Sequence, residues 1–88
     1  MKAIALNKPG GTEELRYVLL NTPSILPHEV LIHVKAISIN PVDTKTRSGR
    51  GLYPRLAGKN PLILGWDVSG TIIETGRAVT EFTAGDEV

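Results

Sequence analysis

The chain is organised around the run Pro61-Leu62-Ile63-Leu64-Gly65-Trp66-Asp67-Val68-Ser69-Gly70, which continues as Thr71-Ile72-Ile73-Glu74-Thr75-Gly76. The first part is an apolar run that enters a Gly-Trp-Asp corner. The second part is rich in β-branched residues, which favour extended backbone, so we expect a strand that leaves the corner and ends at Gly76. Gly70 has no side chain to pack inside this strand. Its presence there indicates a bulge or the close approach of another backbone.

Trp66 and Asp67 place a large aromatic ring beside a carboxylate at the bend of the chain. In a purely structural interpretation, Trp66 packs into the corner and Asp67 caps a turn, and the residue types alone favour this interpretation. In the functional interpretation, the two side chains line a binding site. Both interpretations stay open at this point.

Length, charge and composition limit the possible functions. With 88 residues, the chain is expected to form one small domain with a modest core. The formal net charge of +1 argues against a nucleic-acid or membrane role that rests on bulk electrostatics. Without cysteine the chain has no disulfide framework, no thiolate nucleophile and no cysteine-based zinc site. No segment resembles a signal peptide or a membrane span, so the expected compartment is the cytoplasm.

The first half of the chain predicts three strands. Met1–Leu6 and Leu15–Leu20 are short apolar stretches that flank a Pro-Gly-Gly loop, and we expect them to pair in antiparallel fashion. Glu29–Ile39 is the longest regular segment. Its alternation predicts one core face, formed by Val30, Ile32, Val34 and Ala36. His33 falls on the other face, with no other histidine, cysteine or carboxylate at a spacing typical of metal ligands, and is expected to face solvent.

The character of the sequence changes at Asn40-Pro41-Val42-Asp43. Asparagine is a good helix N-cap, proline suits the first helical position, and a carboxylate is favoured in the first turn. We therefore expect a helix from about Pro41 to Ser48 that ends at Gly49. A helix that begins after a strand can also present a side-chain amide to a ligand, so Asn40 has a functional interpretation as well.

The segment Lys45–Lys59 contains five basic residues, no acidic residue and several glycines. This composition predicts a positively charged loop, which is either solvated surface or the rim of a site for an anionic ligand. Gly49-Arg50-Gly51 is not expected to bind phosphate, because it neither follows a predicted strand nor opens a predicted helix.

The last residues predict a turn at Gly85-Asp86 and the start of a further strand at Glu87-Val88. Because a strand begins where the sequence stops, we interpret the chain as a piece of a longer protein. Four or five strands with one short helix predict a mainly β fold, either a small barrel or a partly open one.

In this order and at these spacings, the Asn-Pro-Val-Asp motif, the 61–70 run and the glycines that follow resemble the N-terminal part of medium-chain dehydrogenases/reductases. The similarity extends over essentially all 88 residues and is strongest with the zinc-independent quinone oxidoreductase and enoyl reductase branch. The resemblance implies that residues 1–88 are the N-terminal part of a GroES-like, partly open β-barrel with a short helix, incomplete at its C-terminal end. This domain would be the substrate side of the enzyme, and a Rossmann domain outside this chain would carry NADP(H).

The sequence departs from the zinc-dependent alcohol dehydrogenases at the positions that matter for the metal. Those enzymes have a cysteine where this chain has Asn40 and a histidine where it has Trp66. Asp67 alone cannot assemble a catalytic zinc site, which usually needs three protein ligands. Val42 replaces a hydroxyl residue that relays a proton in many relatives. We therefore expect no zinc.

The resemblance implies reduction of a quinone or an enone by hydride from NAD(P)H, with Asn40 and Asp43 as catalytic residues. Tyr53, Trp66 and Asp67 would bind the small carbonyl substrate, and the full-length enzyme would be a homodimer. The chain alone is expected to be inactive. Two alternatives stay open: a co-chaperonin-like module, and a family member that binds a ligand or partner without catalysis.

Overall fold

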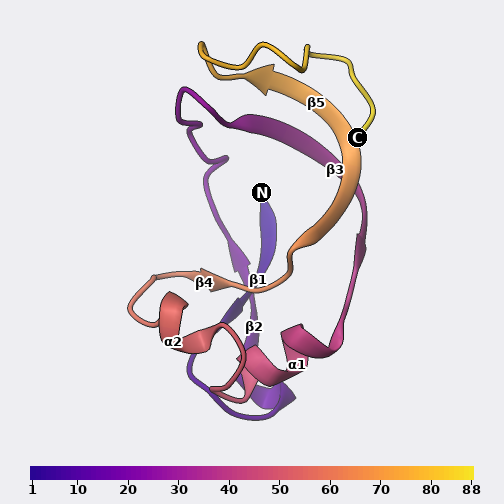
Figure 1. Cartoon of the computed structure of the whole chain (residues 1–88). Helices are drawn as coiled ribbons and strands as arrows, with labels where there is room; N and C mark the ends of the chain where they lie inside the picture. Colours follow the sequence, from indigo (N-terminus) through magenta and orange to yellow (C-terminus); the bar gives the residue numbers. More distant parts are fainter. The chain divides into compact units, whose positions relative to one another are not determined.

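The computed structural model describes residues 1–88 and shows a mainly β protein with a few short helices (Figure 1). The elements in chain order are β1 (Lys2–Leu6), a 3-10 helix η1 (Thr12–Glu14), β2 (Leu15–Leu19), β3 (Val30–Ser38), α1 (Pro41–Arg47), α2 (Tyr53–Leu56), β4 (Leu62–Ile63) and β5 (Asp67–Thr75). The chain forms two compact units: residues 1–21 with 39–66, and residues 22–38 with 67–88. Each unit is described by itself.

The first unit contains a three-stranded antiparallel sheet in the order β2-β1-β4, with β1 in the middle (Figure 1). The predicted pairing of the first two strands is confirmed, in the register Lys2 opposite Leu19. The apolar run before the corner adds β4 to the same sheet, with Leu62 opposite Leu6. The buried apolar side chains of this unit come from β1 and β4: they are Ala5, Leu6 and Leu62.

Helix α1 begins and ends close to the predicted positions. Asn40 is the N-cap, Pro41 is the first helical residue, and Ser48 is the C-cap before Gly49, whose φ of 97° suits glycine. The loop that follows β1 docks on the last turn of α1. The Gly10 N–H donates to the Arg47 carbonyl at 2.9 Å, and the Arg47 Nε donates to the Gly10 carbonyl at 3.1 Å. This reciprocal pair fixes the helix against the loop.

The second unit is built on the antiparallel pair of β3 and β5 (Figure 1). The prediction for Gly70 is confirmed. It lies opposite Val34, next to a register shift, and a Cβ built on it would overlap the carbonyl oxygen of His33. Because no other residue lacks a Cβ, only glycine allows the two backbones to approach this closely.

The predicted core face of β3 is only partly correct. Val30 and Ile32 are half-buried, but Val34 is 52% exposed and Ala36 is also exposed. The pairing with β5 shifts between Leu31 and Ile32 and again between Val34 and Ala36. A bulge inserts an extra residue and breaks the period-two alternation, so a strict alternation does not describe this strand. His33 is exposed, as expected.

The turns after β5 agree with the sequence-based predictions. The Gly76 N–H donates to the Glu29 carbonyl at 2.8 Å, where the chain turns at residues 77–78. A second turn at residues 84–85 brings Glu87 into a bridge with Thr71, and Val88 exchanges two backbone hydrogen bonds of 2.9 Å with Gly70. The predicted extended segment at residues 87–88 therefore pairs with β5.

The prediction of a continuous loop from Lys45 to Lys59 is wrong at Tyr53–Leu56, which forms the one-turn helix α2. A proline at its second position suits the start of a helix, where no N–H bond is needed. The Gly49-Arg50-Gly51 segment thus stands shortly before a helix, although α1 and not a strand precedes it.

The helices are too short to cross a membrane. The longest has seven residues, whereas an apolar helical span needs about 20.

Candidate functional site

Asn40 and Asp43 lie together at the start of α1. The Asn40 backbone is extended, with φ −124° and ψ 163°, and its N–H donates to Oδ2 of Asp43 at 2.8 Å. The Asp43 N–H in turn donates to the backbone carbonyl of Asn40 at 2.9 Å and also faces the Asn40 side chain, so the two residues form a capping box. The side chain of Asp43 therefore fixes the backbone of Asn40, and Asn40 caps the helix.

Asp43 is unusual because a carboxylate is rarely buried. Only 8% of the residue is exposed, and Oδ1, the oxygen that does not bind Asn40, has no hydrogen-bond partner. Burial of a polar atom without a partner costs free energy, which a helix N-terminus offsets in part for a carboxylate. Asn40, whose N–H binds the other oxygen of this carboxylate, is half-buried between β3 and α1 in the chain.

Tyr53 is the first residue of α2 and is half-buried. Its N–H donates to the Arg50 carbonyl at 2.9 Å. The residue before it, Leu52, donates its N–H to Oγ1 of Thr46 at 3.1 Å, so a fully buried hydroxyl on α1 contacts the entry to α2. Sequence reasoning did not single out Thr46, because a threonine within a helix carries no signal that a distant N–H will bind it.

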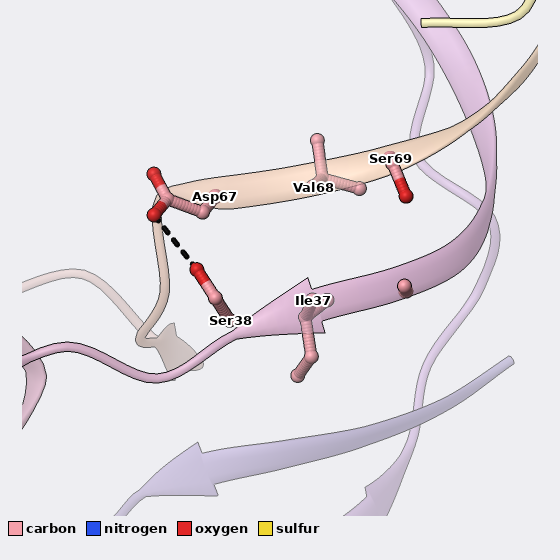
Figure 2. Close-up of a pocket in the computed structure, with 6 residues that line it drawn as sticks. Ile37, Ser38, Asp67, Val68 and Ser69 are labelled. Atoms are coloured by element: carbon pink, nitrogen blue, oxygen red, sulfur yellow. Dashed lines mark hydrogen bonds between the residues drawn. The ribbon is translucent and has the colours of Figure 1, made fainter.

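Asp67 stands at the start of β5, directly opposite Ser38 at the end of β3. The Ser38 Oγ donates to Asp67 Oδ2 at 2.8 Å, and Figure 2 shows the two side chains pointing toward each other. They border an open pocket of about 270 Å³ that is also lined by Ala36, Ile37, Val68 and Ser69. The pocket therefore combines apolar walls with a hydroxyl–carboxylate pair, all within the second unit.

Trp66 ends the first unit and is 43% exposed. The structural interpretation, in which the ring packs into the corner, is therefore correct only in part. Gly65, with φ 106°, makes the bend that precedes it, and no atom lies within 4 Å of a Cβ built there. The left-handed backbone of Gly65 thus makes the bend, and a large part of Trp66 stays accessible to solvent.

The structure thus brings together two of the predicted site residues, Asn40 and Asp43. It adds Ser38 as the partner of Asp67 and Thr46 as the contact to the segment that carries Tyr53. Ser38 could have been found only from the register of β3 and β5, since the bonded residues are 29 positions apart. No group of three or more histidine, aspartate or glutamate side chains lies in a position to bind a metal ion.

The sequence of this chain matches a known protein family. The profile of the alcohol dehydrogenase GroES-like domain matches residues 26–88, which include β3, the capped helix α1 and the whole of β5. The chain belongs to this family. Together with the similar proteins described next, this match confirms the resemblance to the medium-chain dehydrogenases/reductases and to their quinone oxidoreductase branch.

Three similar proteins make the assignment concrete. The mitochondrial NAD(P)H oxidoreductase RTN4IP1 of Bos taurus is 42% identical over 101 residues, covering 100% of this chain and 26% of that protein. The structure of the quinone oxidoreductase from Coxiella burnetii matches 99% of this chain with a TM-score of 0.91 and 40% identity, over 28% of its own chain. The Escherichia coli quinone oxidoreductase, solved with NADPH, matches 99% of this chain with a TM-score of 0.87 and 34% identity, over 26% of its chain.

The chain therefore spans about a quarter of the length of these relatives. The mainly β, GroES-like character predicted from the sequence is confirmed, as is its membership of an oxidoreductase family. The roles of the individual residues and the cytoplasmic location stay predictions, and the relative from Bos taurus is mitochondrial by name.

Proposed function

We propose that this chain is the substrate-side part of a zinc-independent NADPH-dependent reductase of quinones or enones. The observation that carries the proposal is the arrangement at Asn40: a side-chain amide at the junction of β3 and α1, in a backbone conformation held by a buried carboxylate. Relatives of the chain are named as NAD(P)H oxidoreductases and quinone oxidoreductases, which supports the reaction class. A partly open barrel, a homodimer and a cytoplasmic location belong to the same proposal.

In this proposal Asn40 donates a hydrogen bond to the carbonyl oxygen that gains negative charge as hydride, supplied by the bound cofactor, is added to the substrate. Asp43 holds Asn40 in place through the 2.8 Å bond from its N–H. A preformed donor stabilises the developing charge without reorganisation, and for that reason a rigid cap is a suitable support. Tyr53 and the exposed part of Trp66 would contact the apolar body of the substrate.

Asp67 has a different role in this proposal. An ionised carboxylate accepts hydrogen bonds and donates none, so it suits the hydroxyl group of a reduced product better than the carbonyl of a quinone. The pocket beside the Ser38–Asp67 pair has a volume of about 270 Å³, and its lining includes the apolar side chains of Ile37 and Val68, which suits an aromatic compound. We therefore propose that it contacts hydroxylated aromatic compounds such as a hydroquinone.

A stable phenol tests this role of Asp67. Naphthol should bind the 88-residue chain about tenfold more tightly than its methyl ether. The ether has the same rings but no O–H, so it cannot donate a hydrogen bond to the charged Asp67 carboxylate. The preference should vanish in Asp67→Ala and persist in Glu74→Ala, which removes an exposed carboxylate from the same strand. NMR titration measures both affinities. Equal binding of phenol and ether would contradict the proposal.

The residues present do not fit the phosphates of the cofactor. Gly49-Arg50-Gly51 is a glycine-rich segment that stands shortly before α2. Its Gly51 has φ 52° and packs against Thr46, so the backbone of this segment is folded on α1. A Cβ at Gly51 would lie 2.7 Å from the Thr46 Oγ1. A phosphate-binding loop needs N–H groups that are open at the start of a helix. We therefore propose that a Rossmann domain outside these residues binds NADP(H).

It follows that the 88-residue chain alone should not bind NADPH. Isothermal titration calorimetry should detect no heat of binding at micromolar concentrations of the cofactor. A dissociation constant for NADPH in the micromolar range would contradict the proposal that a separate domain binds the cofactor.

The test of the function itself uses a form of the protein that also contains the cofactor domain. Such a protein should consume NADPH in the presence of a naphthoquinone or a conjugated enone, without added metal and after treatment with a chelator. Failure with both substrate types, while NADPH still binds, would favour a family member that binds ligands without catalysis.

A further inference from the structure

We propose that Thr46 is a positioning residue that fixes Tyr53 at the substrate site through its bond to Leu52. This inference rests on the proposed function, in which Tyr53 contacts the substrate. It assigns a role to a residue that neither the sequence pattern nor the family resemblance singles out.

Thr46 is fully buried, with 0% exposure, in the last turn of α1. Its Oγ1 donates to the Val42 carbonyl at 2.7 Å, the usual bond of a threonine inside a helix. The same oxygen accepts the N–H of Leu52 at 3.1 Å. A hydroxyl has one donor and two acceptor positions, so both bonds can form at once. Thr46 therefore joins the body of α1 to the backbone that leads into α2.

Helix α2 depends on this connection because it is only four residues long. A single turn has no stability of its own in water, so contacts outside the turn set its position. Two further backbone bonds hold the segment that leads into α2. The Arg50 N–H donates to the Lys45 carbonyl, and the Tyr53 N–H donates to the Arg50 carbonyl, both at 2.9 Å. The Leu52 bond is the one in this set that a side chain provides, and so the one that a substitution can remove.

Gly51 supports the same conclusion from the other side of the contact. Its φ of 52° lies in the left-handed region, and a Cβ there would lie 2.7 Å from the Thr46 hydroxyl and 3.1 Å from the Thr46 nitrogen. The backbone of the turn thus lies directly on Thr46. Because the Leu52 N–H binds the hydroxyl directly, a change in the hydroxyl should shift Leu52 and, with it, the next residue in the chain, Tyr53.

The first experiment measures amide hydrogen exchange by NMR in the 88-residue chain. Thr46→Val keeps the shape of the side chain and removes the acceptor, so exchange at Leu52 should accelerate roughly tenfold. Thr46→Ser keeps the hydroxyl and should leave it unchanged. Thr44→Val is the matched control, since Thr44 makes the same kind of intrahelical bond, to the Pro41 carbonyl at 2.9 Å, but is exposed. Unchanged exchange in Thr46→Val would overturn the inference.

The second experiment measures quinone reduction in the protein with its cofactor domain. Thr46→Val should raise KM for the quinone about fivefold with a smaller change in kcat, and Thr46→Ser should restore the original KM. If Thr46 acts through Tyr53, the Thr46→Val and Tyr53→Ala double variant should have the KM of Tyr53→Ala alone.

The outcomes separate the inference from the function on which it rests. If Tyr53→Ala raises KM and the Thr46→Val effect multiplies with it, the inference is overturned and the proposed function stands. If Tyr53→Ala leaves KM unchanged while the enzyme is active, Tyr53 is not at the substrate site, and the positioning role falls with that assignment. If the enzyme reduces no quinone or enone, the proposed function itself fails.

Discussion

Asn40→Asp should lower kcat/KM for a quinone or enone about tenfold to a hundredfold in the protein with its cofactor domain. The substitution removes the amide donor and places a negative charge beside the oxygen that becomes enolate-like. Loss of one donor to a developing oxyanion costs ~100- to 1000-fold in well-studied enzymes. We expect less, because in the proposed function Tyr53 and Trp66 also align the substrate. Steady-state kinetics with two substrates measure the effect.

The control must separate chemistry from helix capping. Aspartate caps a helix about as well as asparagine, so capping alone predicts no loss of activity. However, the new carboxylate would stand beside the buried Asp43, and repulsion could alter the cap. Asn40→Ser is therefore a second control, since serine caps equally well without charge and is too short to replace the amide. Full activity in Asn40→Asp would show that Asn40 is only a cap.

Gly70→Ala should lower the free energy of unfolding by about 3 kcal/mol, at the upper end of the range for overpacked sites. The added Cβ overlaps the His33 carbonyl oxygen and lies 2.8 Å from Cγ2 of Ile32. Both neighbours belong to the paired strand, so the backbone itself has to move. Urea denaturation measures the change as a lower midpoint.

The adjacent Ser69→Ala is the matched control for this prediction. Ser69 is exposed on the same strand, and its replacement should change the free energy of unfolding by less than about 0.5 kcal/mol. If both variants unfold at the midpoint of the original protein, the two backbones do not approach as closely at Gly70 as the structure indicates.

Local patterns in the sequence predicted much of this fold. β-branched residues marked β5, and Asn40 with Pro41 marked the start of α1, because these preferences act within a few residues of backbone. The bulges of β3 were not predictable in the same way. They depend on which residues of β5 lie opposite, and a gap in the register at Val34 has no signature in β3 alone.

In the candidate site, too, the local contacts could be predicted from the sequence and the tertiary contacts could not. Asn40 and Asp43 are three residues apart, so a capping box could be predicted from spacing. The contacts of Ser38 with Asp67 and of Thr46 with Leu52 depend on tertiary structure. Helix α2 was missed because glycines and basic residues around it favour a loop, and contacts with α1 outweigh that preference.

The capping box at the start of α1 also limits how this protein can be redesigned. The position that faces the proposed reaction is the same position on which the helix depends, so a library at residue 40 has few acceptable members: asparagine, aspartate, serine, threonine and glycine. Bulky or apolar replacements would confound a change of selectivity with a loss of folded protein. Substrate range is better explored at Tyr53, which is the first residue of α2 and caps no helix with its side chain.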